Sequence, residues 1–158
     1  MNPRRIGTIA LVTLAASGGA ALAAETESFH GTTEGKFFSH GEYRRARISF
    51  ERTGNKLHDI RFEIRVKCPS GQHRSKVGHI RTATVRDGRF KVNQAVVGQP
   101  SGNQAGAFRR AESIRGRISG EHASGVVALL TTLDSHGNES GSGRQCQSSE
   151  VEWTADAD

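Results

Sequence analysis

Hydrophobic and polar residues alternate along much of the chain beyond residue 45. In the clearest run, residues 60–68, every second position is apolar: Ile60, Phe62, Ile64, Val66 and Cys68. A period of two directs alternate side chains to opposite faces of a β-strand, so this run predicts a strand with one buried face. Residues 46–51 alternate in the same way. The Gly54-Asn55 pair between the two runs predicts that they form a hairpin.

The rest of the chain contains further short runs of the same kind. Asp87-Gly88 separates residues 80–85 from residues 89–92 and predicts a two-residue hairpin turn, because both residues tolerate positive φ. Further strands are predicted at 114–118, 126–133 and 145–155. Turns or polar loops are predicted at 69–71, 98–106, 120–125 and 135–143.

These runs amount to about eight short strands, and no segment shows the 3.6-residue period of a helix. From residue 24 onward the chain has 15 Ile or Val but only 4 Leu, a bias that suits strands. The sequence therefore predicts an all-β protein, a single antiparallel β-sandwich or flattened β-barrel. We expect the β-domain to span residues 46–155, preceded by a partly flexible N-terminal segment at 24–45.

The first 23 residues have the features of a secretory signal peptide. Arg4 and Arg5 precede an apolar stretch at 6–23, which ends in Ala21-Leu22-Ala23, a small-x-small cleavage motif. We expect cleavage after Ala23 and a secreted or periplasmic product. No later stretch approaches the ~18 apolar residues of a membrane-spanning helix, so no membrane span is expected.

Cys68 and Cys146 are the only cysteines. In an exported protein a disulfide between them is the expected state. A metal site or a nucleophilic thiol is the alternative. Neither cysteine belongs to a Cys-x-x-Cys pair or has a histidine at zinc-ligand spacing. Cys68 also shares the inward row of its strand with Val66, where a thiolate would be costly.

Arginine is the one compositional excess in a chain with 22 basic and 16 acidic residues and a net charge of +6. Two groups at the starts of strands are candidates for binding an anion: Arg44, Arg45 and Arg47, and Arg109 and Arg110. The expected partner is an anionic cell-surface polymer or an acidic protein. With one Tyr and one Trp the chain offers few stacking platforms, so nucleic acid is not expected.

An ordinary charged outer sheet face is the alternative explanation of the arginines. Arg115 and Arg117 share one face of their strand, and Glu150 and Glu152 share a face of the last predicted strand. Cross-strand pairs between such residues would neutralise the arginines within the protein itself.

No catalytic motif is present. The chain lacks the Gly-x-Ser-x-Gly, Walker-type and His-Glu-x-x-His motifs. The seven histidines form no His-x-His or His-x-x-x-His pair, so solvated loop histidines are expected. The alternatives are a metal site built from His73, His79 and His122, and a weak cation site at the 134–139 turn. We expect no metal and no cofactor.

Three stretches of the second half, 114–120, 123–125 and 146–155, resemble a pattern of small secreted bacterial β-proteins of uncharacterised function. That pattern has an Ile-x-Gly-x-hydrophobic-x-Gly strand, an Ala-x-Gly strand and a terminal Cys-x-x-Gly-x-Val-x-Trp-x-Ala segment, with an earlier cysteine like Cys68. Ser149 stands here in place of the last glycine. The resemblance implies a β fold and export, and it implies no activity.

Cys146 and Trp153 are seven residues apart, so a regular strand would place them on opposite faces. A bulge between them would return both to one face.

The absence of catalytic motifs, the arginine excess and the resemblance together favour a non-enzymatic binding or envelope-associated module. The alternative is a small secreted enzyme or enzyme inhibitor whose site is built from the loops at 98–106 and 135–143.

Overall fold

The computed structural model describes residues 25–98 and 107–158. The expected signal peptide at 1–23 and most of the expected loop at 98–106 lie outside the described residues. Within them no helix is long and apolar enough to cross a membrane.

The described residues form antiparallel strands, which confirms the all-β prediction. The nine strands are β1 (Thr26–Ser39), β2 (Glu42–Thr53), β3 (Lys56–Lys67), β4 (His73–Thr84), β5 (Arg89–Gly98), β6 (Phe108–Ser119), β7 (His122–Leu133), β8 (Arg144–Gln147) and β9 (Val151–Ala157). Most are longer than the sequence pattern predicted, because their polar outer residues continue the pairing past the apolar positions.

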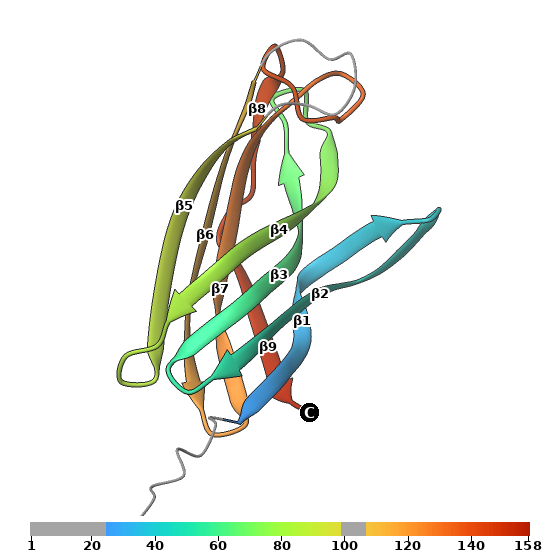
Figure 1. Cartoon of the computed structure of the whole chain (residues 1–158). Coiled ribbons are helices and arrows are strands. Elements are labelled where there is room, and N and C mark those ends of the chain that lie inside the picture. The colour runs from blue at the N-terminus through green and yellow to red at the C-terminus, as the bar shows by residue number, and fades with distance from the viewer. Residues whose placement is uncertain (1–24, 99–106) are drawn as a thin grey trace, which may run out of the picture.

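Six of the strands close into a barrel in the order β3-β2-β1-β9-β7-β8 (Figure 1). The remaining three extend the sheet at two places: β4 pairs with β3, and β6 and β5 continue outward from β7. Of the two predicted architectures, sandwich and barrel, the structure has the barrel. Closure leaves the barrel strands without a free edge, which is how small antiparallel β-proteins avoid edge-to-edge association.

The barrel closes most weakly between β3 and β8. Only one register pair, Lys67 with Gln147, joins these two strands. The predicted disulfide between Cys68 and Cys146 is present directly beside that pair and links positions 78 residues apart. A covalent bond therefore supports the junction that has the fewest backbone hydrogen bonds.

The core follows the inward rows that the alternation predicted. All five apolar positions in residues 60–68 point inward, and four of them, Ile60, Phe62, Ile64 and Val66, are buried. Trp153 is also buried and packs edge-on against Phe50, with their ring centroids 6.0 Å apart. Gly116 makes room for it, since a Cβ there would lie 2.6 Å from the Trp153 ring.

Cys146 and Trp153 both face this core, as the expected irregularity between them requires. The chain leaves the regular pattern after Gln147 and resumes it at Val151, so β8 and β9 are separate strands. Ser148 bridges the break by donating its backbone N–H to Leu129 and accepting the Leu129 N–H on its hydroxyl.

The predicted start of the domain at residue 46 is wrong. The N-terminal segment at 24–45 contains all of β1, which is a strand of the barrel wall paired with β2 on one side and β9 on the other. Its inward row is Phe29, Gly31, Thr33 and Phe37, and a glycine and a threonine hide the period of two. Gly31 is required there because a Cβ would lie 1.8 Å from the Thr154 carbonyl oxygen. The expected turn at 120–125 is also shorter, because β7 already begins at His122.

The far end of the β1–β2 hairpin leaves the barrel as an arm, with His40 and Gly41 in its turn (Figure 1). The exposed rings of Phe38 and Tyr43 pack against one another on this arm, with centroids 4.9 Å apart. The arm is tied to β4, where Phe38 donates its backbone N–H to the Ser75 hydroxyl.

Candidate anion-binding site

The β4–β5 turn places two arginines opposite each other. Asp87 and Gly88 have φ values of 51° and 70°, the left-handed pair that a tight hairpin requires, as the sequence predicted. Arg86 and Arg89 flank them and exchange two backbone hydrogen bonds of 2.8 Å. Residues paired in this way project their side chains to the same face.

The register of β5 and β6 adds three further cations beside this pair. Arg89 lies opposite Arg117, and Lys91 lies opposite Arg115. We call this group the basic patch, and its members are Arg86, Arg89, Lys91, Arg115 and Arg117. All five side chains are exposed.

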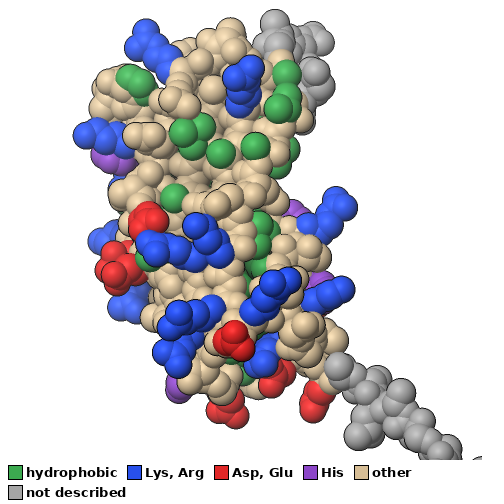
Figure 2. Space-filling view, turned by 90° about the vertical axis from the view of Figure 1, so that its left-hand side faces the viewer, with side chains coloured by type: hydrophobic (Ala, Val, Ile, Leu, Met, Phe, Trp, Pro, Cys, Tyr) green, Lys and Arg blue, Asp and Glu red, His purple; other side chains and the backbone are tan. Residues whose placement is uncertain are grey.

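The basic patch lines an open groove of about 950 Å³. The other walls come from residues 82–84 of β4 and residues 124–126 of β7, with Thr82, Thr84 and Ser124 supplying hydroxyl groups. Among the residues that the structure describes, no carboxylate lines the groove. Figure 2 views the side of the molecule formed by β5 and β6, and basic side chains gather over its lower part.

The electrostatics of the basic patch are unfavourable for folding. Like charges directly opposite each other in a sheet repel and weaken the pairing of the strands. Within the described residues, Arg115 is the one member with an ion pair, to Glu150 at 2.6 Å. Both partners of that pair are more than half exposed, so water screens most of its attraction.

The predicted arginines at the start of β2 behave differently. Arg44 forms a two-pronged ion pair with Glu63, and both N–O distances are 2.5 Å. The hydrogen bonds to Glu63 raise the pKa of Arg44 above its ordinary value. Glu63 also accepts the backbone N–H of Arg47. Arg44 is thus occupied within the chain, while the side chains of Arg45 and Arg47 are exposed.

Of the predicted arginines at the start of β6, one is likewise exposed and the other is bound within the chain. Arg109 is exposed, whereas Arg110 turns inward and binds Glu112 at 2.7 Å and Glu139 at 2.9 Å. Arg110 also donates to the Val77 carbonyl oxygen on the edge of β4. The structure therefore does not assemble five free guanidinium groups from the predicted set.

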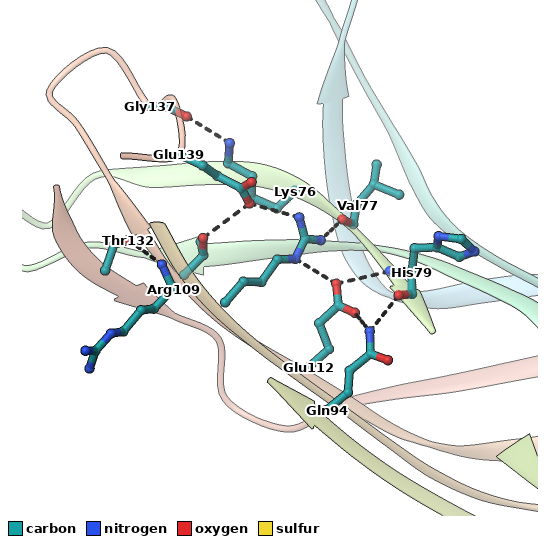
Figure 3. A network of polar contacts seen from close by, with 11 residues as sticks. Lys76, Val77, His79, Gln94, Arg109, Glu112, Thr132, Gly137 and Glu139 are labelled. Carbon is teal, nitrogen blue, oxygen red and sulfur yellow. Dashed lines mark hydrogen bonds and ion pairs between the residues drawn. The ribbon is translucent and has the colours of Figure 1, made fainter. Parts of the chain in front are cut away.

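Arg110 and Glu112 belong to a polar seam that joins the edge of β4 to β5 and β6 (Figure 3). Glu112 accepts the backbone N–H of His79 at 3.1 Å and the side-chain amide of Gln94 at 2.5 Å. Gln94 in turn donates to the His79 carbonyl oxygen at 2.8 Å. These side-chain hydrogen bonds stand in place of the backbone hydrogen bonds that β4 and β5 would form if they were paired strands. Because Glu112 accepts three hydrogen bonds, its role is structural.

Lys76 extends the seam toward the 134–139 turn by donating to the Gly137 carbonyl oxygen at 2.8 Å. Burial lowers the pKa of Lys76, and the nearby Glu139 carboxylate opposes that shift. Asp134 closes the turn by accepting the backbone N–H groups of His136 and Asn138 at 2.9 Å. These hydrogen bonds, chiefly the one from Asn138, lower the pKa of Asp134.

The three histidines considered for a metal site lie apart. His79 pairs with Asp59 at 2.7 Å, and His122 pairs with Asp156 on β9. The pKa of Asp59 is lowered chiefly by a hydrogen bond from Arg61, with His79 contributing. Across residues 25–98 and 107–158, no three His, Cys, Asp or Glu side chains form a group that could hold a metal ion.

Sequence reasoning overlooked Arg86, Arg89 and Lys91. The available signal was the Asp87-Gly88 turn, because a two-residue hairpin fixes the register of its flanking residues. Comparison with known proteins adds nothing to this picture, since no family model and no curated protein matches the chain.

Proposed function

We propose that this chain is a non-enzymatic binding module that works outside the cytoplasm and holds an anionic polymer on the basic patch. The observation that carries the proposal is the register of like charges, Arg89 opposite Arg117 and Lys91 opposite Arg115. The arrangement costs stability in the free protein, and an anionic ligand would remove that cost.

The chemistry of the groove fits repeated anionic groups. Guanidinium groups bind phosphate, sulfate or carboxylate oxygens through paired N–H donors. Neighbouring strands lie ~5 Å apart and residues two apart along a strand lie ~7 Å apart, so the charges cover an area wider than one small anion. The hydroxyl groups of Thr82 and Thr84 offer further donors at the groove wall.

The disulfide is consistent with an oxidising, extracytoplasmic location. Export through a signal peptide cleaved after Ala23 is the finer part of the proposal. Mass spectrometry of the mature protein should show Ala24 at its N-terminus. A mature protein that retains Met1 would contradict this part alone.

The binding test compares two variants that each lose two positive charges. R89Q/R117Q changes the basic patch, and R45Q/R47Q changes the two exposed arginines at the start of β2. With immobilised dextran sulfate as the probe, we expect R89Q/R117Q to weaken binding by about ten-fold or more, equivalent to roughly 1.4 kcal/mol. R45Q/R47Q should bind nearly as the unmodified protein does.

Salt provides the second arm of the test. Raising the ionic strength from 0.1 M to 1 M shortens the Debye length from ~10 Å to ~3 Å, so binding should fall steeply. Equal losses in the two variants would show that overall charge alone attracts the polymer. Binding that resists both salt and R89Q/R117Q would refute the proposal.

A further inference from the structure

The outer face that carries the basic patch continues upward into an apolar half. Along β5 and β6 the next opposed pairs are Asn93 with Ser113, Ala95 with Ala111, and Val97 with Arg109. Leu130 of β7 lies opposite Ala111 on its other side. Figure 2 shows hydrophobic side chains over the upper part of this face, above the cluster of basic ones.

Three depressions run along this face and share their lining residues. The groove at the basic patch shares Lys91, Arg115 and Val126 with a depression of about 340 Å³. That depression shares Asn93 and Ser113 with a third one of about 490 Å³. They form one trough, basic at one end and mainly apolar at the other, and Glu150 lines its middle beside Arg115.

The far end of the trough is lined by alanine and leucine side chains together with polar ones. The residues that form its apolar lining are Ala95, Ala111, Ala128, Leu129 and Leu130. Ala95 and Ala111 are exposed, and Val97 next to them is 70% exposed. Burying these side chains under an apolar chain would release water from them.

We infer that the trough binds a single anionic amphiphile, with its charged head on the basic patch and its hydrocarbon chain along the apolar half. This inference rests on the anion-binding role that the proposed function gives the basic patch, and it differs from that function in the ligand, which is one amphiphile in place of a polymer. Val97 lies six positions after Lys91, a length of roughly 20 Å along an extended strand. One leaflet of a bilayer is ~15 Å of hydrocarbon, half of a ~30 Å core, so an acyl chain fits this length.

Other occupants fit the face less well. A second copy packed on the same face would bring basic patches together, or would set unpaired arginines against apolar side chains. Direct insertion of this end of the barrel into a membrane would carry Arg109 and Arg144 into hydrocarbon, because both are exposed there. A purely polar polymer would bind the basic patch, as the proposed function has it, and would leave the apolar half uncovered.

The experiment uses the mature chain and three probes below their aggregation concentrations. Lysophosphatidic acid carries a phosphate and one acyl chain, glycerol phosphate carries the phosphate alone, and lysophosphatidylcholine has a zwitterionic head. We expect the first to bind at least about ten-fold more tightly than either of the others, measured by isothermal titration calorimetry.

Two variants separate the halves of the trough. A111Q/L130Q makes the apolar half polar, and V77Q is the matched control, because Val77 is exposed on β4 away from the trough. We expect A111Q/L130Q to reduce lysophosphatidic acid binding by about ten-fold while its dextran sulfate binding stays unchanged. V77Q should change neither. Thermal melts confirm that each variant folds.

The outcomes distinguish this inference from the proposed function. If lysophosphatidic acid and glycerol phosphate bind equally, or A111Q/L130Q has no effect, the amphiphile inference is wrong and polyanion binding stands. Binding to vesicles containing phosphatidylglycerol, with no binding of the monomeric lipid, would also overturn it in favour of a membrane surface. If the unmodified protein does not bind dextran sulfate, the proposed function is refuted as well.

Discussion

Arg89 on β5 lies directly opposite Arg117 on β6, and no ion pair neutralises either residue within the described chain. The β4–β5 turn sets Arg86 against Arg89 from the other side. Three arginines therefore stand side by side across neighbouring strands. A sheet selected for stability alone would place an acid in one of these positions.

Removing one of these arginines should stabilise the fold. We expect R117Q to raise the free energy of unfolding by about 0.2–1 kcal/mol, because the like-charge pair with Arg89 is lost. R115Q is the control, since it also removes the ion pair with Glu150 and should gain less. Thermal denaturation at low and high salt measures both, and the gain should shrink as salt screens the repulsion. A lower stability of R117Q would show that the two arginines do not repel.

The disulfide should contribute a large part of the stability. Replacing Cys68 and Cys146 by alanine frees a loop of 78 residues, which the chain-entropy model values at roughly 4.5 kcal/mol. We expect the double variant to melt many degrees below the unmodified protein. A reducing agent should lower the melting temperature of the unmodified protein to that of the variant and leave the variant unchanged. Equal melting temperatures before and after reduction would contradict this account.

The polar seam should depend on Glu112 more than on any exposed acid. E112A leaves the inward-facing Arg110 with Glu139 as its remaining charged partner, and breaking a buried pair costs about 3–5 kcal/mol. R110M/E112L removes both charges and should lose less. Urea denaturation of both variants gives the comparison. If the double variant is the less stable of the two, the seam stabilises by its net attraction instead.

Gly116 should tolerate no side chain. A Cβ at this position would lie 2.6 Å from the Trp153 ring and 2.9 Å from the Phe90 ring. We expect G116A to cost about 1–3 kcal/mol through overpacking. The emission of Trp153, the only tryptophan, should shift as its packing changes. S113A lies on the outer face of the same strand and should leave both stability and emission nearly unchanged.

The 134–139 turn should weaken in acid. The pKa of Asp134 lies below its ordinary value of 3.8 in the folded protein, so its stabilising contribution is complete above that value. The contribution is lost as the pH falls through the folded pKa. D134N keeps an oxygen acceptor but does not titrate. We expect the unmodified protein to exceed D134N in melting temperature at neutral pH, and the difference to vanish in strong acid. A difference that is constant with pH would contradict this.

Local patterns in the sequence predicted much of the fold. The alternation in residues 60–68 predicted β3, and Asp87-Gly88 predicted the β4–β5 turn with its two positive φ values. β1 was missed because Gly31 and Thr33 stand in its inward row, where close approach of the β9 backbone and a hydrogen bond to Glu63 matter more than hydrophobicity.

The site could be predicted only in part, because its members meet through strand register. Arg44 and Arg110 looked available in the sequence, yet Glu63 on β3 pairs with Arg44, and Glu139 joins the neighbouring Glu112 in pairing with Arg110. Arg89 and Arg117 are far apart in the sequence and become neighbours only when β5 and β6 align. Charge counts do not contain this information.

The position of β9 between β1 and β7 determines when the barrel can close during synthesis. Ribosomes add roughly 5–20 residues per second, so β1 is complete several seconds before its second neighbour exists. Throughout that interval one edge of β1 stays open to other chains, which makes this the period of greatest risk of aggregation. Hairpins such as β1–β2 and β6–β7 can form early, but the second edge of β1 stays unpaired until β9 is present. The barrel therefore cannot close before β9 has been made.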